Sequence, residues 1–407
     1  MTTEDPPLPA AGDRARASDR SPVRGWLAVL AVTLGIFSLM TSELLPVGLL
    51  TRVGSDLGVS EGTAGLMVTV PGLVATVAAP VVTVTAGRVD RRVVLAVLIG
   101  LMGVANLASA LATGFAVVLA ARFLIGVSVG GFWAIAGGIA LRLVPERHVP
   151  RAMAVIFGGV EAASVLGVPA GTFVGDLGGW RTAFAAVGVL GLAALVCVVL
   201  LMPAVPAART ITFADLPRVF RGNAGVRAGI ALTLLVITGH FLAYTFVRPI
   251  LQGSGVGDGM VGALLLAFGV AGVCGNFVAG ALAARWLPQT AAGIPVVLAL
   301  AMVLLALAGT SVISAGVLMV LWGLGYGAVP VTFQTWILDA APDANEAASS
   351  LYVATFNLSI ALGALLGGWA VDGVATTSVL WIGAALALLA LLVTTRPRRT
   401  GTAATVE

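Results

Sequence analysis

The chain alternates long apolar runs with short polar interruptions, and most runs are long enough to cross a membrane. A transmembrane helix needs about 20 predominantly apolar residues. The pattern predicts twelve such helices, at residues 26–50, 62–86, 93–113, 115–141, 152–176, 182–202, 228–251, 257–283, 291–311, 313–338, 346–371 and 376–395. We therefore expect an all-α membrane protein, because a helix satisfies its own backbone hydrogen bonds inside lipid.

A polar stretch divides the predicted helices into two groups of six. We expect a tail at 1–24, a first six-helix half at 25–202, a linker at 203–227, a second half at 228–395 and a tail at 396–407. The first tail is rich in Pro, Asp, Ala and Arg and has no apolar run, which predicts disorder. The apolar run after it is too long for a cleavable signal peptide and lacks a small-residue cleavage site.

Composition excludes several classes of protein. Hydrophobic residues make up 59% of the 407 residues and charged residues 10%, and the mean hydropathy is +1.07. The net charge of +4 comes from arginines spread over short loops, a distribution that argues against nucleic-acid binding. Both cysteines fall in apolar segments, so we expect no disulfide and no metal site.

The sequence shows no motif of an enzyme. A phosphate-binding loop of the Gly-x-x-x-x-Gly-Lys type needs a lysine, and the chain contains none. We find no nucleophile triad and no metal-ligand spacing. We therefore expect no enzymatic activity, no cofactor and no direct use of ATP, which leaves an ion gradient as the source of energy.

Arginine placement predicts the orientation in the membrane. Eighteen of the 22 arginines fall in the two tails and in the loops after the second, fourth, sixth and eighth helices. Arg52, Arg181 and Arg248 fall in loops on the other side. Arginine-rich loops remain in the cytoplasm. We therefore expect a multi-pass protein of the plasma membrane with both termini in the cytoplasm.

The two halves repeat each other. At a displacement of 197 residues the second half repeats residues of the first: Gly126 and Gly323, Gly130 and Gly327, Pro145 and Pro342, Arg88 and Arg285. With a slip of one residue, Asp176 corresponds to Asp372. A displacement shared over several helices indicates two parallel six-helix repeats, an arrangement found in transporters.

Ionisable residues inside the apolar runs are few. Glu43, Arg122, Glu161 and His240 lie in the first, fourth, fifth and seventh helices, whereas every third helix has none. The third, sixth, ninth and twelfth helices are therefore expected to face lipid, and the others to enclose a polar cavity. An ionisable residue within a membrane is costly and marks a functional site by default.

These four residues are our candidates for proton coupling. Glu43 and Arg122 lie at similar depth, roughly 10 Å from one end of their helices. Glu43 could bind and release a proton beside the arginine, or the two could form a permanent ion pair. Glu161, nearer the membrane centre, could instead carry the proton or donate a hydrogen bond as a neutral acid. His240 could exchange protons near neutral pH or simply pack.

Large aromatic and amide side chains in the polar helices are candidates for substrate binding. An amide inside a membrane needs a partner and offers both a donor and an acceptor, whereas aromatic rings could stack on a flat ligand or only pack. The candidates are Phe132, Trp133, Tyr244, Asn276, Gln334, Trp336 and Asn357. In addition, Gly126, Gly130 and Gly131 are expected to let another helix approach closely.

Three motifs resemble those of a known family. Gly87-Arg88-Val89-Asp90-Arg91-Arg92 resembles the signature loop between the second and third helices of the major facilitator superfamily. Leu119 to Gly131, with Arg122, resembles the fourth-helix motif of proton-coupled members. Gly167-Val168-Pro169-Ala170-Gly171 resembles the antiporter motif of the fifth helix. The resemblance covers nearly the whole chain after Arg24 and implies the twelve-helix drug:proton antiporter branch.

The resemblance also implies roles and a substrate. Gating is implied for Gly87, Asp90, Arg91, Arg92, Gly167, Pro169 and Gly171. Within the branch, Thr41 to Val47 and Gly130 to Ala134 look most like bacterial purine ribonucleoside efflux permeases, although sugar and chloramphenicol exporters share some of these stretches.

We therefore expect a proton-coupled exporter of purine ribonucleosides or similar compounds that works by alternating access. The alternative is a multidrug, chloramphenicol-type or sugar exporter. A membrane sensor that transports nothing is a less favoured alternative from a different functional class. The expected partners are a small-molecule substrate, protons and the lipid bilayer, without nucleic acid, and we expect a monomer.

Overall fold

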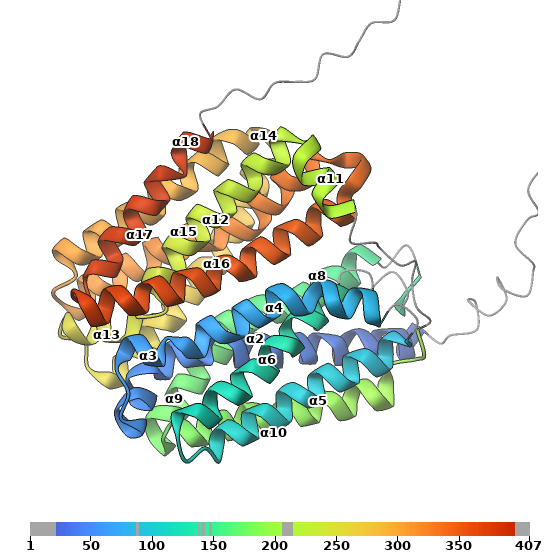
Figure 1. Ribbon diagram of the computed structural model, residues 1–407, viewed down its shortest axis with the longest axis horizontal. Helices are drawn as coiled ribbons and strands as arrows, with labels where there is room; N and C mark the ends of the chain where they lie inside the picture. Colours follow the sequence, from blue (N-terminus) through green and yellow to red (C-terminus); the bar gives the residue numbers. More distant parts are fainter. Residues whose placement is uncertain are drawn as a thin grey trace, which may run out of the picture.

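The helices of the protein form two bundles. A computed structural model describes residues 22–86, 89–136, 139, 143–145, 149–205 and 215–394, and the regular elements within these ranges are all helical. One bundle comprises α2 to α10 and the other α12 to α18 (Figure 1). The helix α11 (Asp215–Gly222) lies in the polar stretch between them.

The helices of the first bundle follow the predicted runs closely. They are α2 (Pro22–Leu57), α3 (Glu61–Ala64), α4 (Leu66–Thr85), α5 (Arg91–Ala110), α6 (Phe115–Ala136), α8 (Val149–Ala162), the π-helical turn η2 (Ala163–Gly167), α9 (Val168–Gly178) and α10 (Trp180–Leu201).

The second bundle contains α12 (Ala224–Tyr244), α13 (Val247–Gly253), α14 (Asp258–Ala308), α15 (Val312–Ala340), the 3₁₀ turn η3 (Pro342–Ala344), α16 (Asn345–Gly373), α17 (Ser378–Leu389) and α18 (Leu391–Thr394). Nine described helices are long and apolar enough to cross a membrane. One of them, α14, consists of two helices joined at a break, and the interrupted α8–η2–α9 and α17–α18 add two more crossings. The fold is therefore an all-α membrane fold consistent with twelve crossings.

Prolines explain where the helices depart from the predicted runs. We expected one helix over 228–251, but the chain breaks at Thr245 and Phe246. Pro249 has no N–H to donate to the carbonyl group of Thr245, four residues earlier. In the fifth crossing, the π-helical turn precedes Pro169, and Val168 N–H donates to the carbonyl of Ala163, five residues back.

The predicted helices 257–283 and 291–311 correspond to the two arms of α14, which meet at a short break instead of the longer loop that we expected. The break lies at Trp286, which has φ −135° and ψ 51°. Pro288 follows two residues later, and a proline is well tolerated in the first turn of the helix that resumes there.

Glycines let the helices approach at equivalent places in both bundles. A Cβ atom at Gly126 or Gly130 would overlap backbone atoms of α4, and one at Gly323 or Gly327 would overlap backbone atoms of α14. The close approach predicted at Gly126 and Gly130 is therefore confirmed. Its recurrence 197 residues later is what two structural repeats require.

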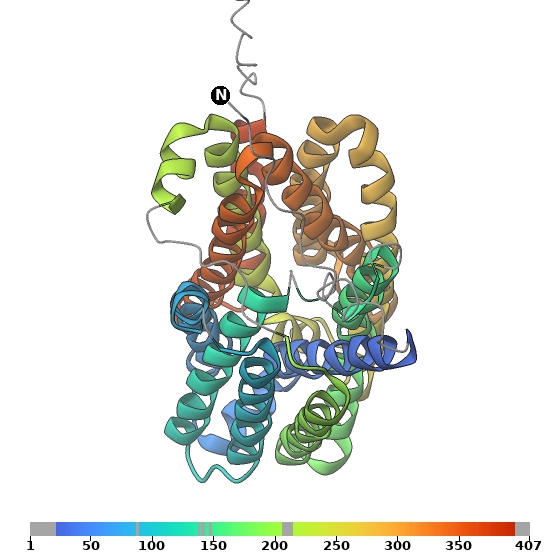
Figure 2. The same ribbon diagram turned by 90° about the vertical axis from the view of Figure 1, so that its right-hand side faces the viewer.

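The bundles meet at one end of the molecule. There α16 packs against α3 and α4, α14 packs against α9 and η2, and α13 packs against α2. This end lies at the left of Figure 1, near α3 and α13, while α8 and α11 lie at the opposite end. Viewed from that opposite end, the two bundles are separate groups of helices (Figure 2).

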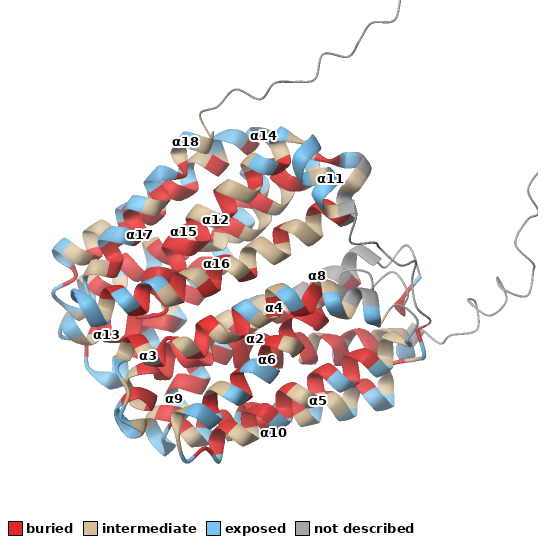
Figure 3. Cartoon of the chain, viewed as in Figure 1, coloured by how far each residue is buried: buried red, intermediate tan, exposed pale blue. Residues whose placement is uncertain are grey.

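Large apolar side chains cover much of the outside. Leu200, Phe277 and Ile313 are 74%, 72% and 81% exposed, and exposed residues follow the outer faces of both bundles (Figure 3). A water-soluble protein rarely exposes such extensive apolar surface. The outer faces are therefore suited to contact with lipid.

Candidate functional site

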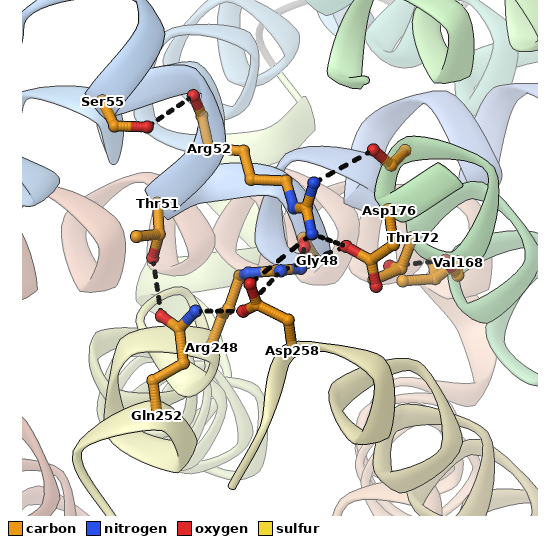
Figure 4. Close-up of polar contacts among 11 residues, drawn as sticks. Gly48, Thr51, Arg52, Ser55, Val168, Thr172, Asp176, Arg248, Gln252 and Asp258 are labelled. Atoms are coloured by element: carbon orange, nitrogen blue, oxygen red, sulfur yellow. Dashed lines mark hydrogen bonds and ion pairs between the residues drawn. The ribbon is translucent and has the colours of Figure 1, made fainter. Parts of the chain in front are cut away.

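Two arginines and two aspartates join the bundles at the end where the bundles meet (Figure 4). The Asp176 carboxylate lies 2.9 Å from Arg52 and 3.1 Å from Arg248. The Asp258 carboxylate lies 3.2 Å from Arg248 and 3.6 Å from Arg52. Because Arg52 and Asp176 belong to the first bundle and Arg248 and Asp258 to the second, two of the four ion pairs, Arg52–Asp258 and Arg248–Asp176, cross between the bundles. We call this end the closed end.

Arg248 is the centre of this network. Its side chain is fully buried, and its Nη1 donates to the carbonyl of Gly48 on α2 at 2.5 Å. Gln252 Nε2 donates to Asp258 at 2.6 Å, and Thr51 donates to Gln252 Oε1 at 3.3 Å. A buried arginine held by carboxylates and a carbonyl group fixes the bundles firmly as long as every partner is present.

A second link lies beside the first. Asp372, at the end of α16, accepts hydrogen bonds from Ser60 Oγ at 2.5 Å and from Gly62 N at 2.9 Å. The chain thus uses an aspartate at the end of both its fifth and eleventh crossings, and Asp176 and Asp372 are the repeat pair that the sequence identified.

Our reading of the sequence missed this network as a functional site. Arg52 and Arg248 entered it only as markers of orientation. Arg52 and Arg248 are 196 residues apart, and so are Asp176 and Asp372. This shared spacing shows that the arginines, like the aspartates, occupy equivalent positions in the two repeats, and it could have identified them as candidates.

Deeper in the first bundle, Arg122 is fully buried and binds backbone carbonyls. Its Nη1 donates to Ser42 O at 2.7 Å, its Nη2 to Glu43 O at 2.9 Å and its Nε to Met67 O at 2.7 Å. No ion pair within 4.0 Å joins its guanidinium to the Glu43 carboxylate, both of which the structure describes. In this conformation, therefore, Arg122 and Glu43 do not form the ion pair that we considered as the alternative.

Prolines explain why these carbonyl groups are available. In an α-helix the carbonyl of residue i accepts from the N–H of residue i+4. Ser42 precedes Pro46 by four residues in α2, and Met67 precedes Pro71 by four residues in α4. Because proline has no N–H, both carbonyls lack a helical donor, and Arg122 supplies the missing hydrogen bonds.

Glu43 lies beside this arginine with its carboxylate unpaired. The residue is 6% exposed, and its side chain makes no hydrogen bond with the described residues. It lies five residues from Gly48, so it is roughly 7–8 Å further into the bundle than the closed end. Glu161 is part of α8, but its side chain lies outside the described residues.

Comparison with known proteins identifies the family. The model of the Major Facilitator Superfamily matches residues 30–352. The chain belongs to this superfamily. Its members are membrane transporters rather than enzymes.

Relatives agree over nearly the full length. The chain is 37% identical over 385 residues to the purine ribonucleoside efflux pump NepI of Escherichia coli K12, an alignment that covers 94% of this chain and 96% of that protein. The corresponding pump of Shigella flexneri is also 37% identical, with the same coverage.

Solved structures share the fold. A bacterial homologue of the human lysosomal transporter Spinster, in an inward-facing and unoccupied conformation, matches with a TM-score of 0.75 at 16% identity and covers 92% of this chain and 98% of its own. The nucleoside transporter NupG matches with a TM-score of 0.75 at 12% identity, covering 91% of this chain and 98% of its own.

In this major facilitator fold, His240 lies within a group of rings. It is fully buried, and its Nδ1 accepts a hydrogen bond from Trp322 Nε1 at 3.0 Å. The Tyr326 ring stacks on it at 3.8 Å, and the Tyr244 ring stacks at 5.0 Å. Phe268 continues the stack at 4.7 Å from Tyr244. Because Nδ1 accepts, the neutral ring carries its proton on Nε2, which is buried without a partner.

The other candidates for substrate binding differ in how exposed their side chains are. Phe132 and Trp336 are buried in the hydrophobic core, and Trp336 Nε1 donates to Gly225 O at 3.1 Å. Asn357 donates to Val353 O at 2.9 Å, and its backbone carbonyl lies against Gly72 of the other bundle. The partly exposed candidates are Trp133, Asn276 and Gln334.

Asn276 is placed between the bundles by its position on α14. It lies on the helix face that also carries Gly262 and Gly269, at intervals of seven residues. Both glycines approach the fifth crossing, at Pro169 and Ser164. Asn276 continues this face away from the closed end.

The predicted gating residues fall into two groups. Gly167, Gly171 and Gly175 form a row on the fifth crossing, and side chains there would overlap Thr41, Leu45 and Leu49 of α2, respectively. This row packs the fifth crossing tightly on α2, next to Pro169.

The second group lies at the opposite end. Asp90 caps α5 by accepting from Arg92 N at 2.8 Å and also accepts from Val205 N at 3.1 Å. Arg91 donates to Ala86 O at 3.2 Å, and Arg92 donates to Val199 O. These contacts stay within the first bundle and the segment that follows it. Gly87 lies outside the described residues.

Proposed function

We propose that this transporter exports nucleosides or nucleoside-like compounds in exchange for protons. The observation that carries the proposal is the 37% identity, over almost the full length, to purine ribonucleoside efflux pumps. Intramembrane acids in the polar helices support an exchange for protons, and the aromatic and amide side chains between and within the bundles suit a base and a ribose.

The proposed cycle starts in the conformation described here. On the arginine distribution, we expect the closed end to lie on the outer side of the membrane and the separate ends of the bundles in the cytoplasm. In this state, substrate binds from the cytoplasm and Glu43 releases its proton to the same side. The network of Arg52, Asp176, Arg248 and Asp258 then separates, substrate leaves outward and Glu43 binds an outer proton.

Three residues have distinct tasks in this proposal. Glu43 carries the proton because its carboxylate is unpaired and partly accessible. Arg122 positions the backbone around Glu43. His240 accepts from Trp322 at Nδ1, and its Nε2–H has no partner among the described residues. It therefore offers a hydrogen-bond donor inside the ring cluster and does not carry the proton.

Transport in everted membrane vesicles tests this function. We expect energised vesicles containing the protein to accumulate radiolabelled inosine or guanosine, and a protonophore to abolish the accumulation. Vesicles without the protein are the control. Accumulation of chloramphenicol or a sugar, without nucleosides, would replace the proposed substrate with one of the alternatives, and the absence of any proton-dependent transport would favour a sensor.

Thiol labelling tests the orientation separately. Cysteines at Ser60 and Gly255 should react with an impermeant maleimide added to intact cells, whereas cysteines at Pro206 and Ala344 should not. Labelling of Pro206→Cys from outside would reverse the orientation, and with it the direction of the cycle.

A further inference from the structure

A membrane-facing groove lies outside the proposed transport pathway. It has a volume of 710 Å³ and is bounded by the two arms of α14, before and after the break at Trp286, and by α15. Gly275, Gly293 and Gly325 line it, and Gly293 is the one of the three beside which a side chain would meet no neighbour. The volume is within the range of 300–1,000 Å³ that small-molecule sites occupy.

The lining of the groove is apolar and faces the membrane. Val278, Leu282 and Trp286 line it and are 57%, 40% and 54% exposed. In a membrane these side chains meet acyl chains rather than water. No atom outside its own helix lies within 4 Å of a Cβ built on Gly293, so the space beside this glycine is open.

Polar groups gather where the groove reaches the break in α14. Gln289 and Thr290 line this part, next to Trp286. Tryptophan is enriched at the level of lipid headgroups, where its apolar ring and its N–H both find suitable surroundings. The break therefore has the character of a membrane interface, and the groove runs from it along the apolar helices.

An unpaired cation lies beside this end. Arg285 precedes Trp286, is exposed, and makes no hydrogen bond or ion pair with any described residue. A guanidinium group binds phosphate through two parallel hydrogen bonds, and basic residues next to a membrane attract anionic lipids. An apolar groove with an arginine next to Trp286, at its polar end, matches the two parts of a phospholipid.

We propose that this groove binds one anionic phospholipid, with an acyl chain between the arms of α14 and the phosphate group at Arg285. The lipid fills the open space beside Gly293 and connects the two arms to α15. This site depends on the membrane fold alone and is independent of the transported substrate.

Photo-crosslinking of the purified full-length protein tests the proposal. Phosphatidylglycerol with a diazirine in an acyl chain is added, and crosslinked residues are mapped by mass spectrometry. We expect crosslinks to concentrate at Val278, Leu282 and Trp286. Gly293→Leu should remove them, because its side chain fills the groove, whereas Gly158→Leu, at an open glycine of the first bundle, should leave them unchanged.

The headgroup is tested with the same reagent. Arg285→Gln should weaken labelling by phosphatidylglycerol about fivefold. Labelling by the matching phosphatidylcholine, which has the same phosphate but no net charge, should fall less. Arg24→Gln, which removes another exposed arginine without a described partner, is the control. Equal labelling of the unsubstituted protein by both lipids, or crosslinks spread evenly over the outer helices, would overturn the proposal.

Discussion

At the scale of single residues, hydrogen-bonding capacity separates the roles of Glu43 and Arg122. Arg122 donates hydrogen bonds to three backbone carbonyls, and the Glu43 carboxylate beside it has no hydrogen-bond partner among the described residues. Arg122 thus holds the proline-interrupted α2 and α4 in place, and the lack of a hydrogen-bond partner at Glu43 suits the proton exchange that we propose. An arginine close to the acid will also influence its proton affinity.

We expect Glu43→Gln to abolish proton-driven export, because an amide keeps the shape of the side chain but cannot exchange a proton. The measurement is nucleoside uptake by everted vesicles under a pH gradient, together with the amount of protein in the membrane. Glu161→Gln is the companion variant. If Glu43→Gln transports normally and Glu161→Gln does not, Glu161 is the proton carrier. If both variants transport normally, neither acid couples transport to protons.

Arg122→Ala should lower the melting temperature, since each carbonyl left without a donor costs about 1–3 kcal/mol. Adding Pro46→Ala restores an N–H for Ser42 O and should recover part of the loss. Pro80→Ala is the control, because it restores an N–H for Thr76 O of α4, a carbonyl to which Arg122 does not donate. Thermal unfolding of the purified variants measures this, and equal recovery with Pro46→Ala and Pro80→Ala would contradict the role that we assign.

Transport by the Arg122→Ala, Pro46→Ala double variant separates hydrogen bonding from charge. If stability returns but transport does not, the positive charge beside Glu43 is needed as well. Arg122→Lys should retain some transport, because lysine keeps the charge but loses the planar fork.

At the scale of elements, glycines decide how closely the helices pack. Gly327→Ala places a methyl group against the backbone of α14 and should destabilise the protein by about 1–3 kcal/mol. Gly293→Ala makes the same change where space is open and should be neutral or stabilising by up to about 1 kcal/mol. Melting temperatures of the two variants provide the measurement. A similar loss in both would show that packing at Gly327 is not limiting.

The sequence predicted the elements well because each membrane crossing is encoded locally. Runs of about 20 apolar residues, the glycines at Gly126 and Gly130 and their repeats at Gly323 and Gly327 all appear in the structure as expected. The π-helical turn before Pro169 and the break at Thr245 and Phe246 were missed, since a proline marks an interruption without specifying its form.

Long-range polar contacts were the harder part to predict. Nothing in the local pattern around Arg122 shows that its guanidinium group binds the carbonyls of Ser42 and Met67. The partners of Arg248 likewise lie 200 residues away at Gly48 and 72 residues away at Asp176. These contacts depend on how the helices and bundles pack together. The internal repeat predicts that two similar bundles exist, but not which side chains meet.

At the scale of the whole molecule, the network at the closed end holds one of at least two arrangements that alternating access requires. Asp176 touches both Arg52 and Arg248, and its side chain is only 13% exposed. Asp56 is a natural comparison, because it pairs with Arg181 at the same end but within the first bundle. The two aspartates therefore differ in whether their ion pairs join the bundles.

We expect Asp176→Asn to shift the population toward the state that is open at this end by about tenfold, which corresponds to about 1.4 kcal/mol. The loss of charge weakens two ion pairs, one of which crosses between the bundles at the fully buried Arg248. Spin labels at Ser55→Cys and Met260→Cys, with both native cysteines replaced by serine, report the separation of the bundles by double electron–electron resonance. Asp56→Asn should leave the distance distribution unchanged. A distribution that Asp176→Asn also leaves unchanged would show that the apolar contacts between α16 and α4, rather than the ion pairs, keep this end closed.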